Sequence, residues 1–422
     1  MLRSIFILVP ILYSAVLHAQ STTPQSPDGK WTKILLTSEF WAEGACAADV
    51  NKDGSMDVLC GPFWYAGPDF KTRHEILPAP QAFQMKKPDG SETTMRGFKG
   101  VVSGDNGFSE NFLSYSADIN GDTWPDYIVI GHPGTETWWY ENPKGEAKQW
   151  TRHLALEKTD NESPKMVDIT GDGIPELLCM SNGTLGYASP NPKNPTEKWA
   201  WHVAAKNPVW AWNTHGLGYG DVNGDGKIDL LTAVNWWEQP ASLKDDPEWK
   251  QHDAIFNNGG SQMFAYDVNG DGLNDVITSY EGHGYCVLWY EQTKEDGVVG
   301  WNRHAITGGN IGDKMVEGET GVVFSQPHSV DLVDMNGDGV KDIVSGKRIW
   351  AHGPDGDMEP NAPAVLYWFE LKREGGKARY VAHLIDDHSG VGTQVMAVDI
   401  NGDKKPDVVV GNKNGAFVFL QK

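Results

Sequence analysis

The chain has few of the residues that stabilise small secreted domains or that bind nucleic acid. Its 422 residues include only four Cys, too few for a disulfide framework. Lys and Arg number 35 against 57 Asp and Glu, for a formal charge of −22, so nothing suggests the basic groove that nucleic acid needs. No apolar run after the N-terminal segment could span a bilayer. A nucleophile elbow, a phosphate loop and a dinucleotide fingerprint are also missing.

The N-terminus is the one strongly apolar segment. Arg3 precedes an apolar stretch from Ile5 to Leu17, and Leu17-His18-Ala19 stands before Gln20, with cleavage expected after Ala19. This pattern predicts a secretory signal peptide over residues 1–19. Residues 20–28 form a Ser/Thr/Pro tether, and residues 29–422 are predicted to fold as one domain. We therefore expect an exported protein in the periplasm, at the cell surface or outside the cell.

One acidic loop recurs seven times, with the pattern Asp-x-Asn-x-Asp-Gly-x-x-Asp. Oxygen side chains at loop positions 1, 3, 5 and 9 suit Ca²⁺, and Gly at position 6 allows a left-handed turn. An EF-hand would need Glu at position 12 and flanking helices, whereas position 12 is Cys60 in the first copy and Thr278 in the fifth. Short apolar runs flank the loops and indicate strands. The sequence thus predicts up to seven structural Ca²⁺ sites in β-hairpins.

The predicted Ca²⁺ ligands are Asp49, Asn51, Asp53 and Asp57; Asp118, Asn120, Asp122 and Asp126; Asp168, Asp172 and Glu176; Asp221, Asn223, Asp225 and Asp229; Asp267, Asn269, Asp271 and Asp275; Asp334, Asn336, Asp338 and Asp342; and Asp399, Asn401, Asp403 and Asp407. Thr170 and Glu176 replace the usual Asn and Asp of the third loop, and Thr123 and Lys404 replace the turn Gly of the second and seventh. We expect weaker binding in these three loops.

A longer unit surrounds each loop. An aromatic run such as Trp138-Trp139-Tyr140 follows most loops, and then a segment such as Trp150-Thr-Arg-His153. Strand, acidic hairpin, strand, aromatic strand and a fourth strand with the His make up one propeller blade. The last unit lacks a fourth strand, and residues 30–36 resemble the missing one. We predict an all-β, seven-bladed β-propeller with a Ca²⁺ hairpin in each blade, closed by the N-terminal strand.

With these motifs the chain resembles the FG-GAP/VCBS repeat proteins, which include integrin alpha head domains, over essentially the whole mature sequence. The segments at His215-Gly-Leu-Gly, His283-Gly-Tyr and Gly346-Lys347-Arg348-Ile-Trp350-Ala-His352 also resemble a group of secreted bacterial propellers. The resemblance implies the propeller and its metal loops. It implies little about activity, because one fold hosts many functions.

The histidines fall into two sets. Six occupy the repeated fourth-strand position, which predicts packing or hydrogen bonding between blades: His74, His153, His202, His252, His304 and His383. Six others are not repeated and enter a first strand or leave a second strand: His132, His215, His283, His328, His352 and His388. These six, with the long insertions at residues 78–110, 307–325 and 346–364, should share the face opposite the acidic loops. A rigid scaffold with variable loops is where a site is expected.

Two classes of function remain open for this face. The first is a lyase or dehydratase acting on uronate or keto-sugars, similar in fold to propeller sugar lyases. Its candidate catalytic residues are His215, His328, His283, Arg348, Lys347 and Tyr280, with a base that removes a proton and cations that stabilise the enolate. Candidate substrate-binding residues are Trp236, Trp237, Glu238, His132, Trp350 and His352. Histidines beside carboxylates also make Zn²⁺ or another divalent metal a candidate there.

The second class is a non-catalytic propeller that binds carbohydrate or protein, as an adhesin or lectin does. If the protein is an enzyme, we expect the unrepeated histidines, Arg348 and Lys347 to share one pocket. If it is a binding module, we expect a shallow aromatic surface. Trp side chains suit a sugar ligand in either case.

Two cysteines flank the first loop. Cys46 and Cys60 lie on strands expected to pair, so they form either a disulfide or two small buried side chains. Cys179 and Cys286 are expected in the core.

Overall fold

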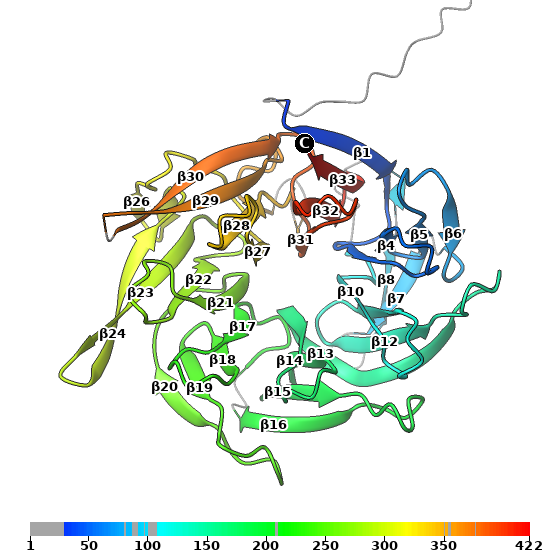
Figure 1. Ribbon diagram of the computed structural model, residues 1–422, viewed down its shortest axis with the longest axis horizontal. Coiled ribbons are helices and arrows are strands. Elements are labelled where there is room, and N and C mark those ends of the chain that lie inside the picture. The colour runs from blue at the N-terminus through cyan, green and yellow to red at the C-terminus, as the bar shows by residue number, and fades with distance from the viewer. Residues whose placement is uncertain are drawn as a thin grey trace, which may run out of the picture.

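The computed structural model describes residues 29–79, 82–86, 92–96, 98–99, 108–206, 210–349, 351–352, 356–375 and 377–422. The predicted signal peptide and tether, and the candidate Trp350, lie outside the described residues. Throughout the described part the regular elements are β-strands. Figure 1 shows the sheets arranged in chain order around a common centre.

Most sheets are antiparallel groups of consecutive strands. One sheet contains β3 (Cys46–Ala48), β4 (Asp57–Cys60), β5 (Phe63–Tyr65) and β6 (Arg73–Glu75). The next contains β10 (Leu113–Ala117), β11 (Asp126–Ile130), β12 (Thr135–Glu141), β13 (Thr151–Val167), β14 (Glu176–Ser181), β15 (Thr184–Ser189) and β16 (Ala200–Lys206). The long strand β13 pairs with β12 through its first half and with β14 through its second.

An eight-stranded sheet follows. It contains β17 (Leu217–Gly220), β18 (Asp229–Thr232), β19 (Asn235–Glu238), β20 (Lys250–Asp253), β21 (Gln262–Tyr266), β22 (Asp275–Ser279), β23 (Val287–Glu295) and β24 (Val298–Ala305). Its two halves meet where β17 runs parallel to β21. A further sheet contains β27 (Val330–Val333), β28 (Asp342–Gly346), β29 (Leu366–Glu374) and β30 (Lys377–Asp386). There are also three two-stranded sheets: β2 (Glu39–Phe40) with β9 (Phe98–Lys99), β7 (Ala82–Lys86) with β8 (Glu92–Arg96), and β25 (Gly309–Ile311) with β26 (Lys314–Val316).

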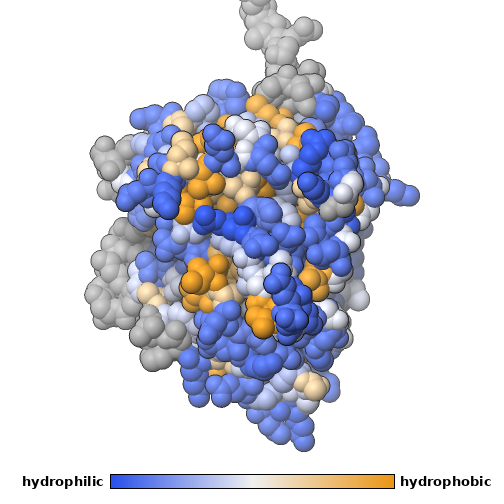
Figure 2. Space-filling view, turned by 90° about the vertical axis from the view of Figure 1, so that its left-hand side faces the viewer, coloured by the Kyte–Doolittle hydropathy of each residue, from blue (hydrophilic) through white to orange (hydrophobic). Residues whose placement is uncertain are grey.

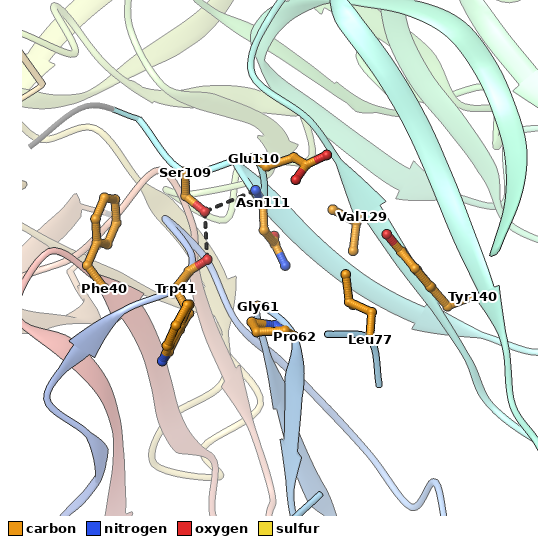
Figure 3. Close-up of a pocket in the computed structure, with 10 residues that line it drawn as sticks. All are labelled: Phe40, Trp41, Gly61, Pro62, Leu77, Ser109, Glu110, Asn111, Val129 and Tyr140. Atoms are coloured by element: carbon orange, nitrogen blue, oxygen red, sulfur yellow. Dashed lines mark hydrogen bonds between the residues drawn. The ribbon is translucent and has the colours of Figure 1, made fainter. Parts of the chain in front are cut away.

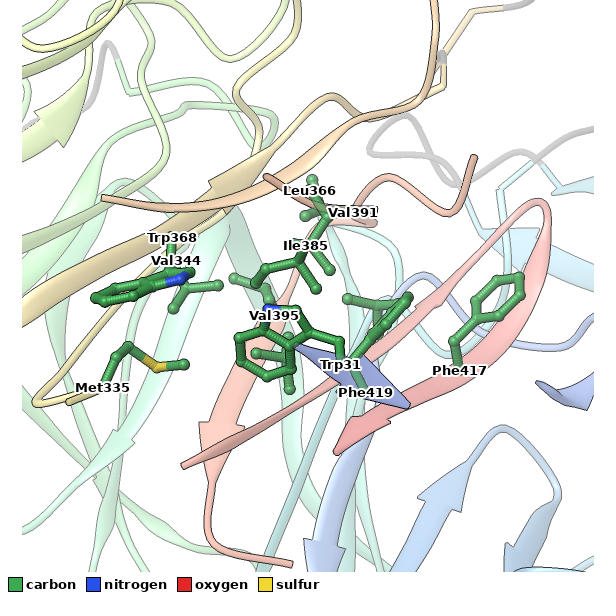
Figure 4. Packing of buried hydrophobic residues seen from close by; sticks show 12 residues of the cluster. Trp31, Met335, Val344, Leu366, Trp368, Ile385, Val391, Val395, Phe417 and Phe419 are labelled. Carbon is green, nitrogen blue, oxygen red and sulfur yellow. The ribbon is translucent and has the colours of Figure 1, made fainter. Parts of the chain in front are cut away.

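The first described strand joins the last sheet. β1 (Trp31–Thr37) pairs antiparallel with β33 (Gly415–Gln421), which continues through β32 (Asp407–Asn412) to β31 (Val395–Val398). Trp31 is 1% exposed and packs in one cluster with Phe419 of β33 and Trp368 of β29 (Figure 4). Burial of such large aromatic surfaces stabilises this junction by several kcal/mol, at about 25 cal/mol per Å².

Every acidic loop connects two antiparallel strands: β3 to β4, β10 to β11, β13 to β14, β17 to β18, β21 to β22, β27 to β28 and β31 to β32. In loop 4, for example, the buried Asp229 at position 9 accepts the backbone N–H groups of Val222 and Gln239. In five other loops the Asp at position 9 likewise accepts two backbone N–H groups. One comes from the second residue of the loop and the other from a residue in the third strand or just beyond it. Position 9 therefore anchors the loop to the sheet.

The third loop is built differently. Glu176 accepts the N–H of Ile169 through Oε2, and its Oε1 accepts the hydroxyl of Thr170 at 3.1 Å. Glu176, which replaces the usual Asp, thus bonds Thr170, which replaces the usual Asn. The two substitutions in this copy of the repeat therefore contact each other.

Two loops hold a side chain in the left-handed region. Thr123 and Lys404 have φ of 74° and 70°, where the fourth loop has Gly226 at 85°. A residue with a Cβ costs about 1–2 kcal/mol in this region. We expect Thr123→Gly and Lys404→Gly each to raise the free energy of unfolding by about 1 kcal/mol, as measured by urea denaturation. The neighbouring exposed Lys405 does not have positive φ, so Lys405→Gly should not stabilise; equal effects of the two Lys substitutions would contradict this account.

The repeated histidines stack on the aromatic strand next to them. In the flattest pair, His252 lies 3.8 Å from Trp236 with 4° between the ring planes. The other pairs are Trp64–His74, Trp139–His153, Tyr187–His202, Trp289–His304 and Trp368–His383. All six pairs lie directly opposite each other on adjacent strands. The ring stacking is therefore within a sheet and not between blades. A contact between sheets is made by Nδ1 of His202, which lies 2.6 Å from Asp246 in the loop between β19 and β20.

The disulfide alternative is not realised. Cys46 lies opposite Leu59, one residue from Cys60, and a one-residue offset places two side chains on opposite faces of a sheet. Cys46 packs in the cluster with Tyr127, and Cys60 packs in the cluster with Tyr65. All four cysteines are buried free thiols.

The outer surface is largely hydrophilic. Figure 2 shows apolar side chains in small separate groups on the side where β24, β26 and β30 lie in Figure 1. The most exposed large apolar residues include Val298 of β24 and Met315 of β26, at 71% and 69%. Isolated residues of this kind are normal on a surface. Within the described residues, none of the elements is a helix of the length and apolarity that crossing a membrane requires.

Candidate functional site

A carboxylate and three imidazoles meet at the centre of the molecule. The Nε2 atom of His215 lies 3.2 Å from Oε2 of Glu162 and 3.1 Å from Nε2 of His283. The Nε2 atom of His328 lies 3.1 Å from the same Oε2 of Glu162. The four ligand atoms all lie within 4.8 Å of one another. We call this set the histidine–glutamate centre.

The four residues come from segments far apart in the chain. Glu162 lies within β13, His215 precedes β17, His283 lies between β22 and β23, and His328 precedes β27. The acidic loops occupy the other ends of these strands, so the centre lies on the opposite face. The Glu162 N–H donates to the Thr214 carbonyl at 2.9 Å, which fixes the carboxylate beside His215.

The centre is buried and poorly supplied with hydrogen bonds. His328 is 1% exposed, and neither of its ring nitrogens has a hydrogen-bond partner. Oε2 of Glu162 and Nδ1 of His283 also lack one. Although Nε2 of His328 and Oε2 of Glu162 are close, their alignment is not that of a hydrogen bond. Buried polar atoms without partners cost about 1–3 kcal/mol each, which makes such a cluster a candidate for function.

Burial and mutual contact shift all four pKa values. Burial raises the pKa of Glu162, but His215 and His328 outweigh it and hold that pKa well below its usual range. For His215 burial lowers the pKa, and Glu162 reverses the shift so that it is raised. Burial and the charge of Arg348 lower the pKa of His328 to about 4, and burial with the other imidazoles lowers that of His283. The histidines thus favour the unprotonated form, except His215 beside the carboxylate.

A buried ionic triad lies next to the centre. Glu43 accepts hydrogen bonds from Arg348 at 2.9 Å and from Lys413 at 2.6 Å. The three residues are at most 2% exposed. The backbone of Arg348 is tied to Gln326 by an N–H···O bond of 2.9 Å, and Gln326 is tied to Gly284 at 2.7 Å. The loops that carry His283, His328 and the triad therefore form one connected layer.

Aromatic and acidic groups line the same region. The ring of His132 lies 5.5 Å from Trp212 and 4.7 Å from Phe108. Asp357, from an insertion, accepts from Nδ1 of His352 at 2.8 Å and lies 3.8 Å from Nδ1 of His283. The insertion at residues 346–364 thus contributes to this face, as does Phe108 at the end of the insertion at residues 78–110.

Several predicted site residues lie elsewhere. Lys347 is buried and donates to the Ser325 hydroxyl at 2.8 Å. Tyr280 packs in the apolar cluster that contains Tyr285, not in the centre. Trp236 and Glu238 belong to the stacked unit of His252, whose Nε2 lies 2.8 Å from Glu238. Trp237 is 5% exposed and packs in the core. His388 is exposed beside Asp387.

The sequence analysis missed Glu162, Glu43 and Lys413, yet their positions carry a signal. Glu43, Glu162, His215 and His328 each stand six residues before the first Asp of an acidic loop. His132, Arg348 and Lys413 each stand six residues after the ninth position of a loop. Two equivalent positions of the repeat therefore supply most of this face. Aligning the copies and reading these two columns would have found the missing residues.

A concavity with an apolar lining lies near the triad. Phe40, Trp41, Pro62, Leu77, Val129 and Tyr140 give it an apolar lining, with Gly61, Ser109, Glu110 and Asn111 completing it (Figure 3). The Ser109 hydroxyl donates to the Trp41 carbonyl at 2.6 Å and accepts the N–H of Asn111 at 3.0 Å. Asn111 in turn accepts the N–H of Glu43 through its carbonyl, which links this pocket to the triad.

Two family models match the chain, both around acidic loops. The FG-GAP-like repeat matches residues 118–179, and the FG-GAP repeat matches residues 391–418. The chain carries FG-GAP repeats. The resemblance to FG-GAP repeat proteins is thereby confirmed over these two segments. No curated protein matches the chain.

Two solved structures that match this chain have little sequence in common with it. One is BBS1N from its complex with ARL6DN, with 9% identity and a TM-score of 0.49 over 94% of this chain and 98% of that chain. Another is a lectin from Agrocybe aegerita, described by its recognition of non-reducing terminal N-acetylglucosamine. Its identity is 13% and its TM-score 0.43 over 91% of this chain and 87% of that chain.

Proposed function

We propose that this FG-GAP protein is an exported, Ca²⁺-stabilised, seven-bladed propeller that binds a carbohydrate or protein ligand. FG-GAP repeats are typical of extracellular and surface proteins, and the N-terminal residues have the pattern of a signal peptide. The antiparallel pairing of β1 with β33 supports closure of the ring by the N-terminal strand.

The acidic loops have the donor set for Ca²⁺. In the fourth loop the Asp221 carboxylate accepts the N–H groups of Asp225 and Gly226, and Asn223 accepts that of Asp225. These contacts hold oxygen side chains on one tight turn, above the buried Asp229. Carboxylate and amide oxygens on such a turn fit Ca²⁺. Positions 1, 3, 5 and 9 of each loop would hold the ion, and its role would be structural.

The ligand is proposed to bind on the face opposite the loops. The observation that carries this proposal is the convergence of unrepeated polar and aromatic side chains there, with Trp212 and His132 beside the histidine–glutamate centre. Trp212 is half-buried, so one surface of the indole can stack on a sugar ring or a protein side chain. Recurring side chains elsewhere already have packing partners.

Calorimetry with the mature Ca²⁺-loaded protein tests this proposal against a panel of uronate glycans, neutral glycans and extracellular proteins. We expect Trp212→Ala to weaken binding of the responding ligand about tenfold or more, as for a contact worth over 1.4 kcal/mol. Trp64→Ala is the matched control, because Trp64 stacks on His74 within a sheet. Equal losses in both variants, or no heat with any ligand, would contradict a site on this face.

A lyase or dehydratase acting on uronate or keto-sugars is the second candidate. The convergence of His215, His283 and His328 near Arg348 favours it, whereas Lys347 and Tyr280 lie outside the centre. In this reaction a base removes the proton next to a carbonyl or carboxylate and a β-substituent leaves. Ultraviolet absorbance of the new conjugated double bond would report it, and it should vanish in His215→Ala or His328→Ala.

A further inference from the structure

We propose that Glu162, His215, His283 and His328 bind one divalent transition-metal ion, for which Zn²⁺ is the best match. This inference goes beyond the proposed function, since it depends on neither a ligand nor the Ca²⁺ loops. It rests on the identity of the donor atoms, their spacing, their missing hydrogen bonds and the groups behind them.

The donor atoms and their spacing suit a tetrahedral ion. Three imidazole nitrogens and one carboxylate oxygen form a common Zn²⁺ ligand set. With bonds of about 2.0–2.1 Å, neighbouring ligand atoms of a tetrahedral site stand about 3.3–3.4 Å apart. The contacts of Oε2 of Glu162 with His215 and His328 are 3.2 and 3.1 Å, and His215 and His283 are 3.1 Å apart at Nε2. These three contacts are close to the tetrahedral spacing, and all pairs of the four ligand atoms lie within 4.8 Å.

Hydrogen bonding alone accounts poorly for this arrangement. Only one hydrogen bond is formed among the four donor atoms, between Nε2 of His215 and Nε2 of His283. Nε2 of His328 and Oε2 of Glu162 are buried and in close contact, but neither forms a hydrogen bond. One cation bound by all four atoms satisfies each of them at once. A structural cluster of side chains would be expected to pair them instead.

Groups behind two of the three histidines, His215 and His283, suit a metal site. Nδ1 of His215 lies 3.0 Å from the Asn213 carbonyl, so its proton belongs on Nδ1 and the lone pair on Nε2. Asp357 stands 3.8 Å behind Nδ1 of His283. Backbone carbonyls and carboxylates behind imidazoles are typical of metal sites, because they fix the tautomer and the ring. Glu43 pairs with Arg348, so the carboxylate of Glu162 remains available to the metal.

A neighbouring group shares one of these residues. His283, His352 and Asp357 also place ligand atoms within 4.8 Å of one another. There His352 is 53% exposed, and the carboxylate already accepts its Nδ1. The histidine–glutamate centre is better enclosed, and it contributes four ligands instead of three. We therefore assign the ion to Glu162 and not to Asp357.

The test uses the mature full-length protein, stripped of metal and then saturated with Ca²⁺ so that the acidic loops are filled. Titration with ZnCl₂, followed by elemental analysis after dialysis, should give one Zn²⁺ per chain. Glu162→Gln and His215→Ala should each weaken Zn²⁺ binding about 100-fold or more, since loss of a ligand exceeds the 10–100-fold cost of losing a group behind one. His252→Ala is the matched control, because His252 also contacts a Glu but belongs to the repeated stack. This control and His352→Ala should keep the full equivalent.

A measurement on the unsubstituted protein guards against variants that fail to fold. X-ray absorption of the Zn²⁺-loaded protein should show three imidazole ligands, and Co²⁺ should give the intense visible bands of a tetrahedral site. An oxygen-only coordination shell would mean that Zn²⁺ occupies the acidic loops and would overturn the assignment. So would the absence of tight Zn²⁺ binding, or full binding by folded Glu162→Gln and His215→Ala. Because no glycan or protein ligand is used, failure here leaves the proposed ligand site untouched.

Discussion

Removal of Ca²⁺ should lower the melting temperature of the mature protein by about 10 °C or more. An ion that binds only the folded state stabilises it by about 2.7 kcal/mol per site at 100 times its Kd. For large domains each kcal/mol corresponds to about 2–4 °C. Several Ca²⁺-filled loops together should therefore stabilise the protein by more than any single substitution considered above changes its stability. Each loop connects two neighbouring antiparallel strands, so each ion would hold two strands together.

Differential scanning calorimetry before and after chelation measures this effect, with Ca²⁺ and Zn²⁺ added back separately to distinguish the loops from the histidine–glutamate centre. Asp225→Asn, in a loop with the full ligand set, should reduce the gain from Ca²⁺. Asp172→Asn should reduce it less, because Glu176 and Thr170 already bond each other in that loop. Asp313→Asn, on the exposed turn between β25 and β26, should have no effect. An unchanged melting temperature in excess EDTA would contradict the structural role of Ca²⁺.

The strands and hairpins could be predicted because each copy of the repeat contains its own local contacts. Asp229 bonds Val222 and Gln239 within one unit, so the local motif is enough to predict the hairpin. The joining of units was harder to predict. A Cβ on Gly218 would lie 1.9 Å from the Met263 carbonyl oxygen, and so the close parallel pairing of β17 with β21 requires glycine there. The sequence shows this glycine but not the strand it approaches.

The candidate site was predicted in part for a similar reason. His215, His283 and His328 interrupt the repeat, and this marked them as functional candidates. Glu162 and Glu43 were overlooked because the chain has many acidic residues. Only their position relative to the acidic loops distinguishes these two. Trp236 and Glu238 were misplaced because their neighbour His252 belongs to a recurring pair of strands. Register, and not residue type, decides which of these side chains reach the centre.

The second large effect is expected from Glu43→Gln, which should lower the free energy of unfolding by about 3–5 kcal/mol. Glu43 is fully buried and is the shared partner of Arg348 and Lys413. Burial raises the pKa of Glu43, but the two cations outweigh it and lower that pKa. Replacing the carboxylate with an amide leaves two buried cations without their counter-charge. The contacts also join the N-terminal segment to the β32–β33 turn, so their loss loosens the two ends of the described chain.

Urea denaturation of Glu43→Gln against Glu157→Gln separates this buried triad from ordinary ion pairing. Glu157 pairs with Lys198 at 2.7 Å, but both side chains are more than half exposed, and such surface pairs contribute little. A double variant, Glu43→Gln with Lys413→Met, should recover part of the loss because it removes one unpaired cation together with its partner. If Glu43→Gln is as stable as Glu157→Gln, the buried cations Arg348 and Lys413 do not depend on the Glu43 carboxylate as their counter-charge, and this account of the triad is wrong.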